Sequence, residues 1–192
     1  MKHIRTASRL LLLLTLLTGL VYPLSITGLA QLFFPWQANG SLLKKDGKII
    51  GSTWIGQSFT SPDFFHGRPS ATSPLPYDAK NSSGSNLALT NPMLIHALQT
   101  NIHNLHLLDP ENHQRIPIDL VTHSASGLDP DISPMAALYQ IPRIAKVRGI
   151  SNDVLTHIVD QYTMRPYAGF MGEPRVNVLA LNMALLSHSK AG

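Results

Sequence analysis

An uncharged, leucine-rich stretch near the N-terminus constrains this chain more than any other feature. No charged side chain occurs from Leu10 to Leu43, and the 25 positions from Leu10 to Phe34 contain eleven leucines. As a helix, at about 1.5 Å per residue, these positions extend ~37 Å, enough to cross a hydrocarbon layer of ~30 Å. The sequence therefore predicts one transmembrane helix over residues 10–34.

Individual residues mark the middle and the end of the predicted span. Phe34 and Trp36 stand at its far end, where aromatic rings favour the membrane interface. Pro23 lies in the middle and is expected to kink the helix, because proline cannot donate the helical hydrogen bond. We therefore expect Leu10, Pro23, Phe34 and Trp36 to contact the membrane.

Basic residues give the span a direction. Lys2, Arg5 and Arg9 precede it without any acidic residue, and such positive flanks stay in the cytoplasm. This pattern predicts a cytoplasmic N-terminus over residues 1–9 and an extracytoplasmic domain over residues 35–192.

A cleaved secretory signal is the alternative. Its apolar region would be Leu10–Val21, and Gly28-Leu29-Ala30 would offer small residues for cleavage. Against it, the apolar run continues through Phe34. Both interpretations export the C-terminal part of the chain.

Composition narrows the chemistry of the exported domain. The 192-residue chain has no cysteine, which excludes disulfides and thiolate sites. Its 15 basic and 11 acidic residues give a charge of +4; without the three basic residues before the span, 12 against 11 leaves +1. A nearly neutral domain lacks the cationic surface that nucleic-acid binding needs.

Local patterns predict an α+β fold for residues 35–192. Short apolar runs separated by glycines predict a hairpin of 48–50 with 53–55, and the aromatic residues in the proline-rich passage 61–85 favour an ordered loop. Asn91-Pro92 and Ser133-Pro134 are helix-start signals. The remaining expected elements are a strand at 116–121, a break or bend at Pro142, a helix from Ser151 that buries Val154, Ile158 and Val159, and a last helix within 176–186.

The sequence contains no clear motif for catalysis or metal binding. The chain has no glycine-rich phosphate loop. The residue types of a serine triad occur at Asp119, His123 and Ser124, but triads are assembled from segments that are distant in sequence, so this short stretch alone does not indicate one. His103 and His106 could share a helix face, but no third ligand stands at a tight spacing. We predict no catalytic residue and no metal site.

Three turns rich in small polar residues, at 67–71, 82–86 and 124–130, either shape loops or dock another subunit.

Several motifs together carry a resemblance. They are Tyr22-Pro23, Phe34-Pro-Trp-Gln-Ala-Asn-Gly-Ser41, Ile55-Gly-Gln-Ser-Phe59, Phe65-His-Gly-Arg-Pro-Ser-Ala71, Gly84-Ser-Asn86, Asp119-Leu-Val-Thr122, Ser126-Gly-Leu-Asp129, Gln140-Ile-Pro-Arg143, Val176-Asn-Val178 and Leu181-Asn182. In this order, from the anchor to the last helix, they resemble the C subunit of the bacterial high-affinity potassium-transporting P-type ATPase, the Kdp complex. The histidines on the first helix and Ala180 depart mildly from the family pattern.

The resemblance implies a non-catalytic subunit of a pump in the bacterial inner membrane. Its partners would be a channel-like A subunit, an ATP-hydrolysing B subunit and a small F subunit, and the complex, rather than this chain, would handle ATP and potassium. The family description is a catalytic chaperone that raises the ATP affinity of the B subunit. That description conflicts with an extracytoplasmic domain, because ATP is cytoplasmic.

Two roles therefore stand after the resemblance: a cap over the potassium entrance, or an effect on nucleotide binding by contact or long-range coupling. Ser124, Ser126 and Gly127 are the candidate nucleotide contacts, and the candidate interface residues are Gln57, Phe59, Arg68, Asn86, Gln140 and Arg143. A stand-alone, membrane-anchored exported binding protein is the remaining alternative.

Overall fold

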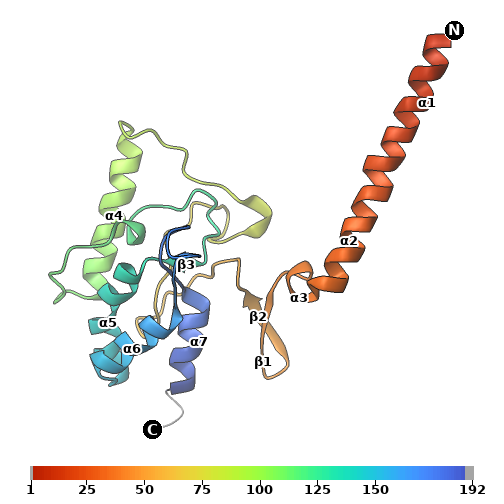
Figure 1. The fold of residues 1–192 in the computed structure, drawn as a ribbon. Coiled ribbons are helices and arrows are strands. Elements are labelled where there is room, and N and C mark those ends of the chain that lie inside the picture. The colour runs from red at the N-terminus through yellow and green to blue at the C-terminus, as the bar shows by residue number, and fades with distance from the viewer. Residues whose placement is uncertain (1, 189–192) are drawn as a thin grey trace. The chain divides into compact units, whose positions relative to one another are not determined.

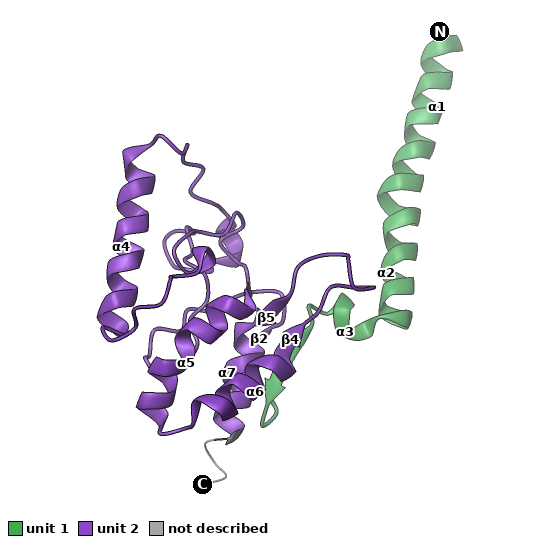
Figure 2. Cartoon of the chain, turned by 60° about the vertical axis from the view of Figure 1, so that its left-hand side comes forward, with its two compact units in different colours: residues 1–50 green, residues 51–192 purple. Residues whose placement is uncertain are grey.

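The fold is that of a computed structural model, which describes residues 2–188. The chain divides into two compact units after Ile50 (Figure 2). These units are defined by packing within the chain. The predicted boundaries at residues 9 and 34 concern the side of the membrane on which each segment lies, and they stay a prediction.

The first unit begins with a continuous helix from Lys2 to Phe33 (Figure 1). It consists of α1 (Lys2–Leu16), a π-helical segment (Leu17–Val21) and α2 (Tyr22–Phe33), and none of its residues is buried. Within residues 2–188 it is the one helix both long and apolar enough to cross a membrane. The predicted N-terminal apolar helix is confirmed.

The π-helical segment ends two residues before Pro23. In a regular α-helix the ring of Pro23 would crowd the carbonyl of Gly19, and no N–H would be available to bond it. A π-helical turn relieves this conflict by widening the helix locally. The helix continues to Phe33, and the predicted kink at Pro23 stays a prediction.

A short helix, α3 (Pro35–Ala38), and a hairpin follow. Strand β1 (Leu42–Lys45) pairs with β2 (Lys48–Ser52). Asp46 and Gly47, between the strands, both have positive φ, as a two-residue hairpin turn requires. The predicted pairing of 48–50 with 53–55 is wrong because the Asp-Gly turn, rather than the later glycines, sets the register.

The second unit combines helices with a small antiparallel sheet. The sheet has the order β3 (Asp131–Ile132), β5 (Arg175–Asn177), β4 (Thr163–Met164), and Val176 of the central strand pairs with Ile132 and Thr163. Three helices contact β5: α5 (Pro134–Arg148), α6 (Asn152–Tyr162) and α7 (Val178–His188). The predicted α+β class is confirmed.

The core lies between these helices and the sheet. Its largest fully buried side chains include Ile144, Leu155, Leu181 and Leu185, joined by Phe65 from the long loop 61–85. The loop is ordered, as its aromatic residues predicted, and contains only a short 3₁₀ helix, η2 (Ala79–Asn81).

Helix α4 (Pro92–Leu108) lies at the edge of the second unit in both views (Figures 1 and 2). Asn91 caps it as predicted, since its side chain accepts the N–H of Met93 at 2.9 Å. No residue of α4 is buried; Leu105 packs against the core, whereas Ile95 and Leu107 are exposed. The apolar side chains of α4 are therefore only partly covered by the core.

Three local expectations are corrected. The predicted strand at 116–121 is a 3₁₀ helix, η3 (Ile118–Leu120), because the carboxylate of Asp119 bonds Ser133 rather than leaving an extended segment. Helix α5 does not break at Pro142, because packing of the residues on either side outweighs the one missing hydrogen bond; the alternative of a bend at this residue stays a prediction. Val154 is exposed, and Leu155 takes its expected place in the core.

The starts of α5 and α6 follow the prediction. Ser133 accepts the N–H of Ala136, and Ser151 accepts that of Val154. Of the last apolar segment, Val176 and Asn177 belong to β5, and the expected helix begins at Val178.

Candidate functional site

An open pocket of about 710 Å³ lies where η3, β3 and the start of β5 meet in the second unit. Apolar side chains, among them Ile118 and Met135, form part of its wall. Charged side chains of both signs form the rest: Arg68, Arg115, Asp119, Asp129, Asp131, Glu173 and Arg175. The pocket thus combines an apolar wall with charged side chains of both signs.

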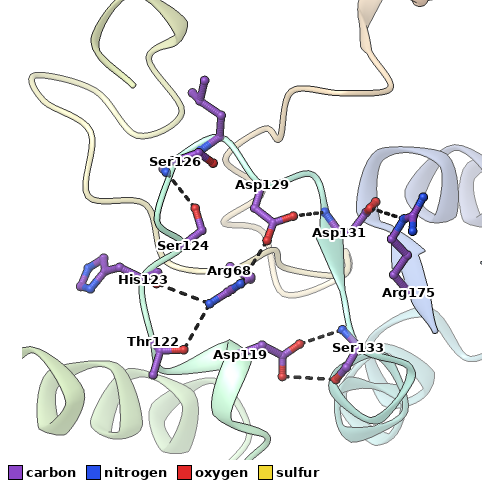
Figure 3. Close-up of polar contacts among 12 residues, drawn as sticks. Arg68, Asp119, Thr122, His123, Ser124, Ser126, Asp129, Asp131, Ser133 and Arg175 are labelled. Atoms are coloured by element: carbon purple, nitrogen blue, oxygen red, sulfur yellow. Dashed lines mark hydrogen bonds and ion pairs between the residues drawn. The ribbon is translucent and has the colours of Figure 1, made fainter. Parts of the chain in front are cut away.

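Arg68, a predicted interface residue, reaches this pocket from the long loop. Its Nη1 donates to Oδ2 of Asp129 at 3.1 Å, and its Nη2 lies 3.4 Å from both Oγ1 of Thr122 and the carbonyl oxygen of His123 (Figure 3). The Arg68 and Asp129 side chains are 25% and 30% exposed, so the ion pair remains accessible from solvent. One guanidinium therefore joins two segments that are far apart in sequence.

The neighbouring carboxylates are also engaged within the chain. Asp119 accepts the backbone N–H of Ser133 at 2.7 Å, and Asp129 accepts that of Asp131 at 3.1 Å (Figure 3). Asp131 pairs with Arg175 at 2.9 Å. Among the described residues no group of three or more acidic or histidine side chains could hold a metal ion.

Asp131, the acid paired with Arg175, is partly buried. Burial raises its pKa, while the hydrogen bond from Asn177 and the charge of Arg175 act in the opposite direction. These two partners replace part of the hydration that the side chain of Asp131 loses on burial.

Tyr77 holds the backbone of Arg68 through a hydrogen bond. Its hydroxyl donates to the carbonyl oxygen of Arg68 at 2.6 Å, and burial raises the pKa of Tyr77 to about 12, so the hydroxyl remains a donor. A side chain at Gly56 or Gly67 would collide with Tyr77. This close approach gives a physical reason for two glycines in the motifs around Arg68.

The candidate nucleotide residues form a turn. Ser124 is buried, and its Oγ accepts the N–H of Gly127 at 2.8 Å; the Oγ of Ser126 accepts the N–H of Leu128 at 3.1 Å. Gly127 has a φ of 68°, and a Cβ there would meet Thr72. Both hydroxyls thus stabilise the turn, and their assignment to nucleotide stays a prediction.

Asp119, His123 and Ser124 do not form a relay in the described part of the chain. Asp119 bonds Ser133 and Ser124 bonds Gly127, and the imidazole of His123 points away from both (Figure 3).

Gln140 and Arg143, predicted at an interface, are only 3% and 5% exposed. Arg143 donates to the carbonyl oxygens of Pro62 and Phe64, and Gln140 bonds both backbone groups of His66. Burial lowers the pKa of Arg143 to about 10. An interface role for this pair stays a prediction, and it would act through the shape of the loop that the pair holds.

The other predicted interface residues occupy different positions. The ring centroid of Phe59 lies 5.6 Å from that of Phe64, with the ring planes tilted by 46°, and Phe59 shares a pocket of about 400 Å³ with Arg68. Gln57 is half-buried beside Gly51, and Asn86 is exposed with a φ of 51°. The structure brings Phe59 and Arg68 together and leaves Asn86 apart from the pockets that contain these two.

Sequence reasoning missed the acidic half of the site and Tyr77. The available signal was Asp129, which ends the motif Ser126-Gly-Leu-Asp129 and has the charge that Arg68 needs. Nothing in the sequence indicated that Asp119 or Asp131 would share the pocket.

Comparison with known proteins identifies the family to which this chain belongs. The family model described as K⁺-transporting ATPase, c chain, matches residues 4–187. The chain belongs to the KdpC family. A potassium-transporting ATPase KdpC subunit of Rhodopseudomonas palustris (strain BisB18) is 54% identical, covering 96% of this chain and 98% of that protein.

Two further relatives bear the same description. The protein of Polaromonas naphthalenivorans (strain CJ2) is 55% identical over 96% of this chain and 95% of its own length. That of Methylococcus capsulatus (strain ATCC 33009 / NCIMB 11132 / Bath) is 53% identical over 95% of this chain and 96% of its own length. The resemblance to this family is therefore confirmed along nearly the whole chain.

Proposed function

We propose that this chain is a non-catalytic subunit of an ATP-driven, high-affinity potassium uptake pump. The observation that carries the proposal is the family match over residues 4–187, which includes both the apolar helix and the folded domain. Relatives described as KdpC subunits share more than half of its residues over nearly full length.

The proposed location is the bacterial inner membrane, crossed once. The helix from Lys2 to Phe33 has the required length and hydropathy. Lys2, Arg5 and Arg9 favour a cytoplasmic N-terminus, and this orientation supports a periplasmic location for the domain.

The proposed role is assembly with a channel-like A subunit, an ATP-hydrolysing B subunit and a small F subunit. The domain would cap the potassium entrance of the A subunit, with the pocket beside Arg68 as its contact region. The mixed charges of this pocket support a polar protein contact, because rim charges set register and suppress wrong partners.

An effect on the ATP affinity of the B subunit would then be indirect. A domain outside the cytoplasm can bias a nucleotide site only by favouring one conformation of the pump. The engagement of the Ser124 and Ser126 hydroxyls within their turn supports coupling over direct phosphate contact.

Co-purification with the pump subunits tests the proposal. The tagged full chain, expressed with these subunits and extracted in mild detergent, should elute with them. Arg68→Ala should clearly reduce the fraction of the chain that co-purifies with the pump subunits, because Arg68 lies at the accessible pocket. The same substitution should change the thermal midpoint of the chain only slightly. Lys80→Ala, which removes an exposed charge elsewhere in the same loop, is the matched control.

Different outcomes separate the alternatives. A monomer after extraction would support a stand-alone exported binding protein. Equal losses of assembly and stability in Arg68→Ala would give Arg68 a structural role. Protease protection of the domain in sealed right-side-out vesicles would exclude the external cap, and ATP-analogue labelling abolished by Ser126→Ala would support direct nucleotide contact.

A further inference from the structure

The turn between β4 and β5 exposes large apolar side chains (Figure 2 labels both strands). Tyr167 and Phe170 are each 80% exposed, and Met171 is 56% exposed. We call residues 164–172 the β4–β5 tip. Clusters of exposed aromatic residues are unusual on a domain that contacts only water, and they mark interaction sites.

Backbone hydrogen bonds hold this tip in shape. Tyr167 and Met171 exchange N–H···O bonds of 3.0 Å in both directions, and Phe170 donates to the carbonyl oxygen of Tyr167 at 3.3 Å. Ala168 and Gly169 have positive φ, which closes the turn. At its base, Thr163 pairs with the buried Val176 of the central strand. The side chains are therefore displayed by a defined turn on a core strand.

The charge of the tip is one-sided. Arg165, which is exposed, is the only charged residue among residues 164–172. Glu173 lies beyond the tip, and Arg175 is paired with Asp131. Aromatic residues, methionine and an arginine together suit the interface of a bilayer, where rings occupy the headgroup level and a cation meets anionic phosphates.

A bilayer is also the surface most available to this domain. Residues 35–50 link the apolar helix to the second unit, and even fully extended, at about 3.4 Å per residue, they reach at most ~60 Å. By contrast, three side chains on one turn fall short of the ~800 Å² per partner of a standard protein interface.

We propose that the β4–β5 tip inserts into the headgroup region of the bilayer that the N-terminal helix enters, with anionic phospholipid as the ligand of Arg165. The inference rests on the proposed membrane crossing but not on assembly into a pump. It gives the domain a second membrane contact and thereby limits its tilt relative to the anchor.

The absence of cysteine allows a direct test on the full chain. Single-cysteine variants Phe170→Cys, Leu89→Cys and Leu20→Cys, each labelled with an environment-sensitive fluorophore, are reconstituted into vesicles of phosphatidylcholine and phosphatidylglycerol, about 3:1, containing a lipid-bound quencher. Leu89, which is 88% exposed in another loop, is the matched control. Leu20 lies in the apolar helix and reports whether that helix is inserted.

The Phe170 label should emit at shorter wavelength and be quenched about twofold or more relative to the Leu89 label. Arg165→Gln should reduce this difference in anionic vesicles but leave it unchanged in pure phosphatidylcholine. If the Leu20 label is quenched and the Phe170 label matches Leu89, the tip does not touch lipid and the inference is overturned.

Two other outcomes are also decisive against it. A Phe170 label that becomes shielded only when the pump subunits are added would assign the tip to a protein contact instead. An unquenched Leu20 label would overturn the membrane crossing and the inference together.

Discussion

Buried side-chain amides explain how a long loop with few apolar residues stays ordered. Asn182, 1% exposed, accepts the N–H of Phe65 at 2.8 Å and donates to its carbonyl oxygen at 2.9 Å. Gln140 does the same for His66 at 2.8 and 3.1 Å. Each amide thus replaces the backbone partner that a strand would have supplied, which satisfies groups that would be costly to bury unbonded.

His66 makes this part of the loop sensitive to acid. Burial lowers its pKa below the ordinary 6.5, although the carbonyl oxygen of Ser61, 2.9 Å from Nε2, acts in the other direction. Below pH 6.5 the unfolded chain binds more protons at this residue than the folded chain, so the free energy of unfolding should fall as the pH falls through this range. His66→Gln should flatten the decrease in thermal midpoint between about pH 7.5 and 5.5.

The exposed His157 on α6 provides the control for this titration. His157→Gln should keep the wild-type pH dependence of the midpoint. An unchanged slope in the His66 variant would mean that another group governs acid sensitivity.

Among the elements, α5 fixes the loop through Arg143. The guanidinium donates to the carbonyl oxygens of Pro62 and Phe64 and to Oε1 of Gln140. A lysine keeps the charge but cannot direct donors to three fixed acceptors. Arg143→Lys should therefore lower the free energy of unfolding by about 1–3 kcal/mol and accelerate amide exchange at His66, measured by denaturant unfolding and hydrogen exchange.

Lys146→Ala on the same helix is the comparison for Arg143→Lys. Its ion pair with Glu111 is solvent-exposed on both sides, so its loss should leave the unfolding midpoint and the exchange at His66 nearly unchanged. Equal stability of Arg143→Lys and the wild type would show that the loop is held by its aromatic residues instead.

Elements with local signals were the predictable part of the fold. Asn91-Pro92 and Ser133-Pro134 start helices because cap and first turn are adjacent in sequence. The continuity of α5 through Pro142 depended on tertiary packing, and the 3₁₀ turn at Ile118 depended on a bond between Asp119 and Ser133, 14 residues apart. Neither is encoded in a short window.

The same limit applies to the candidate site. Arg68 was identified through its motif, but its partner Asp129 lies 61 residues away, and the pairing required the fold. Gln140 and Arg143 were identified as contact residues through their motif, which did not indicate that their buried polar groups would bond the long loop. Their role at an interface stays a prediction.

At the scale of the whole molecule, the helix and the domain are separable in packing. No residue from Lys2 to Phe33 is buried, whereas the core cluster lies entirely within the second unit. An apolar surface of that length without protein contact is stable only when lipid or partner helices surround it.

The domain should therefore fold without the helix. When a cleavable signal replaces residues 1–34, the remaining chain should be exported, leave the membrane fraction in alkaline carbonate, and unfold with a free energy within about 1 kcal/mol of the full chain in detergent. The full chain should stay with the membranes in carbonate and leave them only in detergent, because the uncharged, apolar stretch over residues 10–34 is too costly to transfer to water. Release by carbonate of a product shortened by about 30 residues would instead support cleavage near Ala30, and the domain would then reach its partners without an anchor of its own.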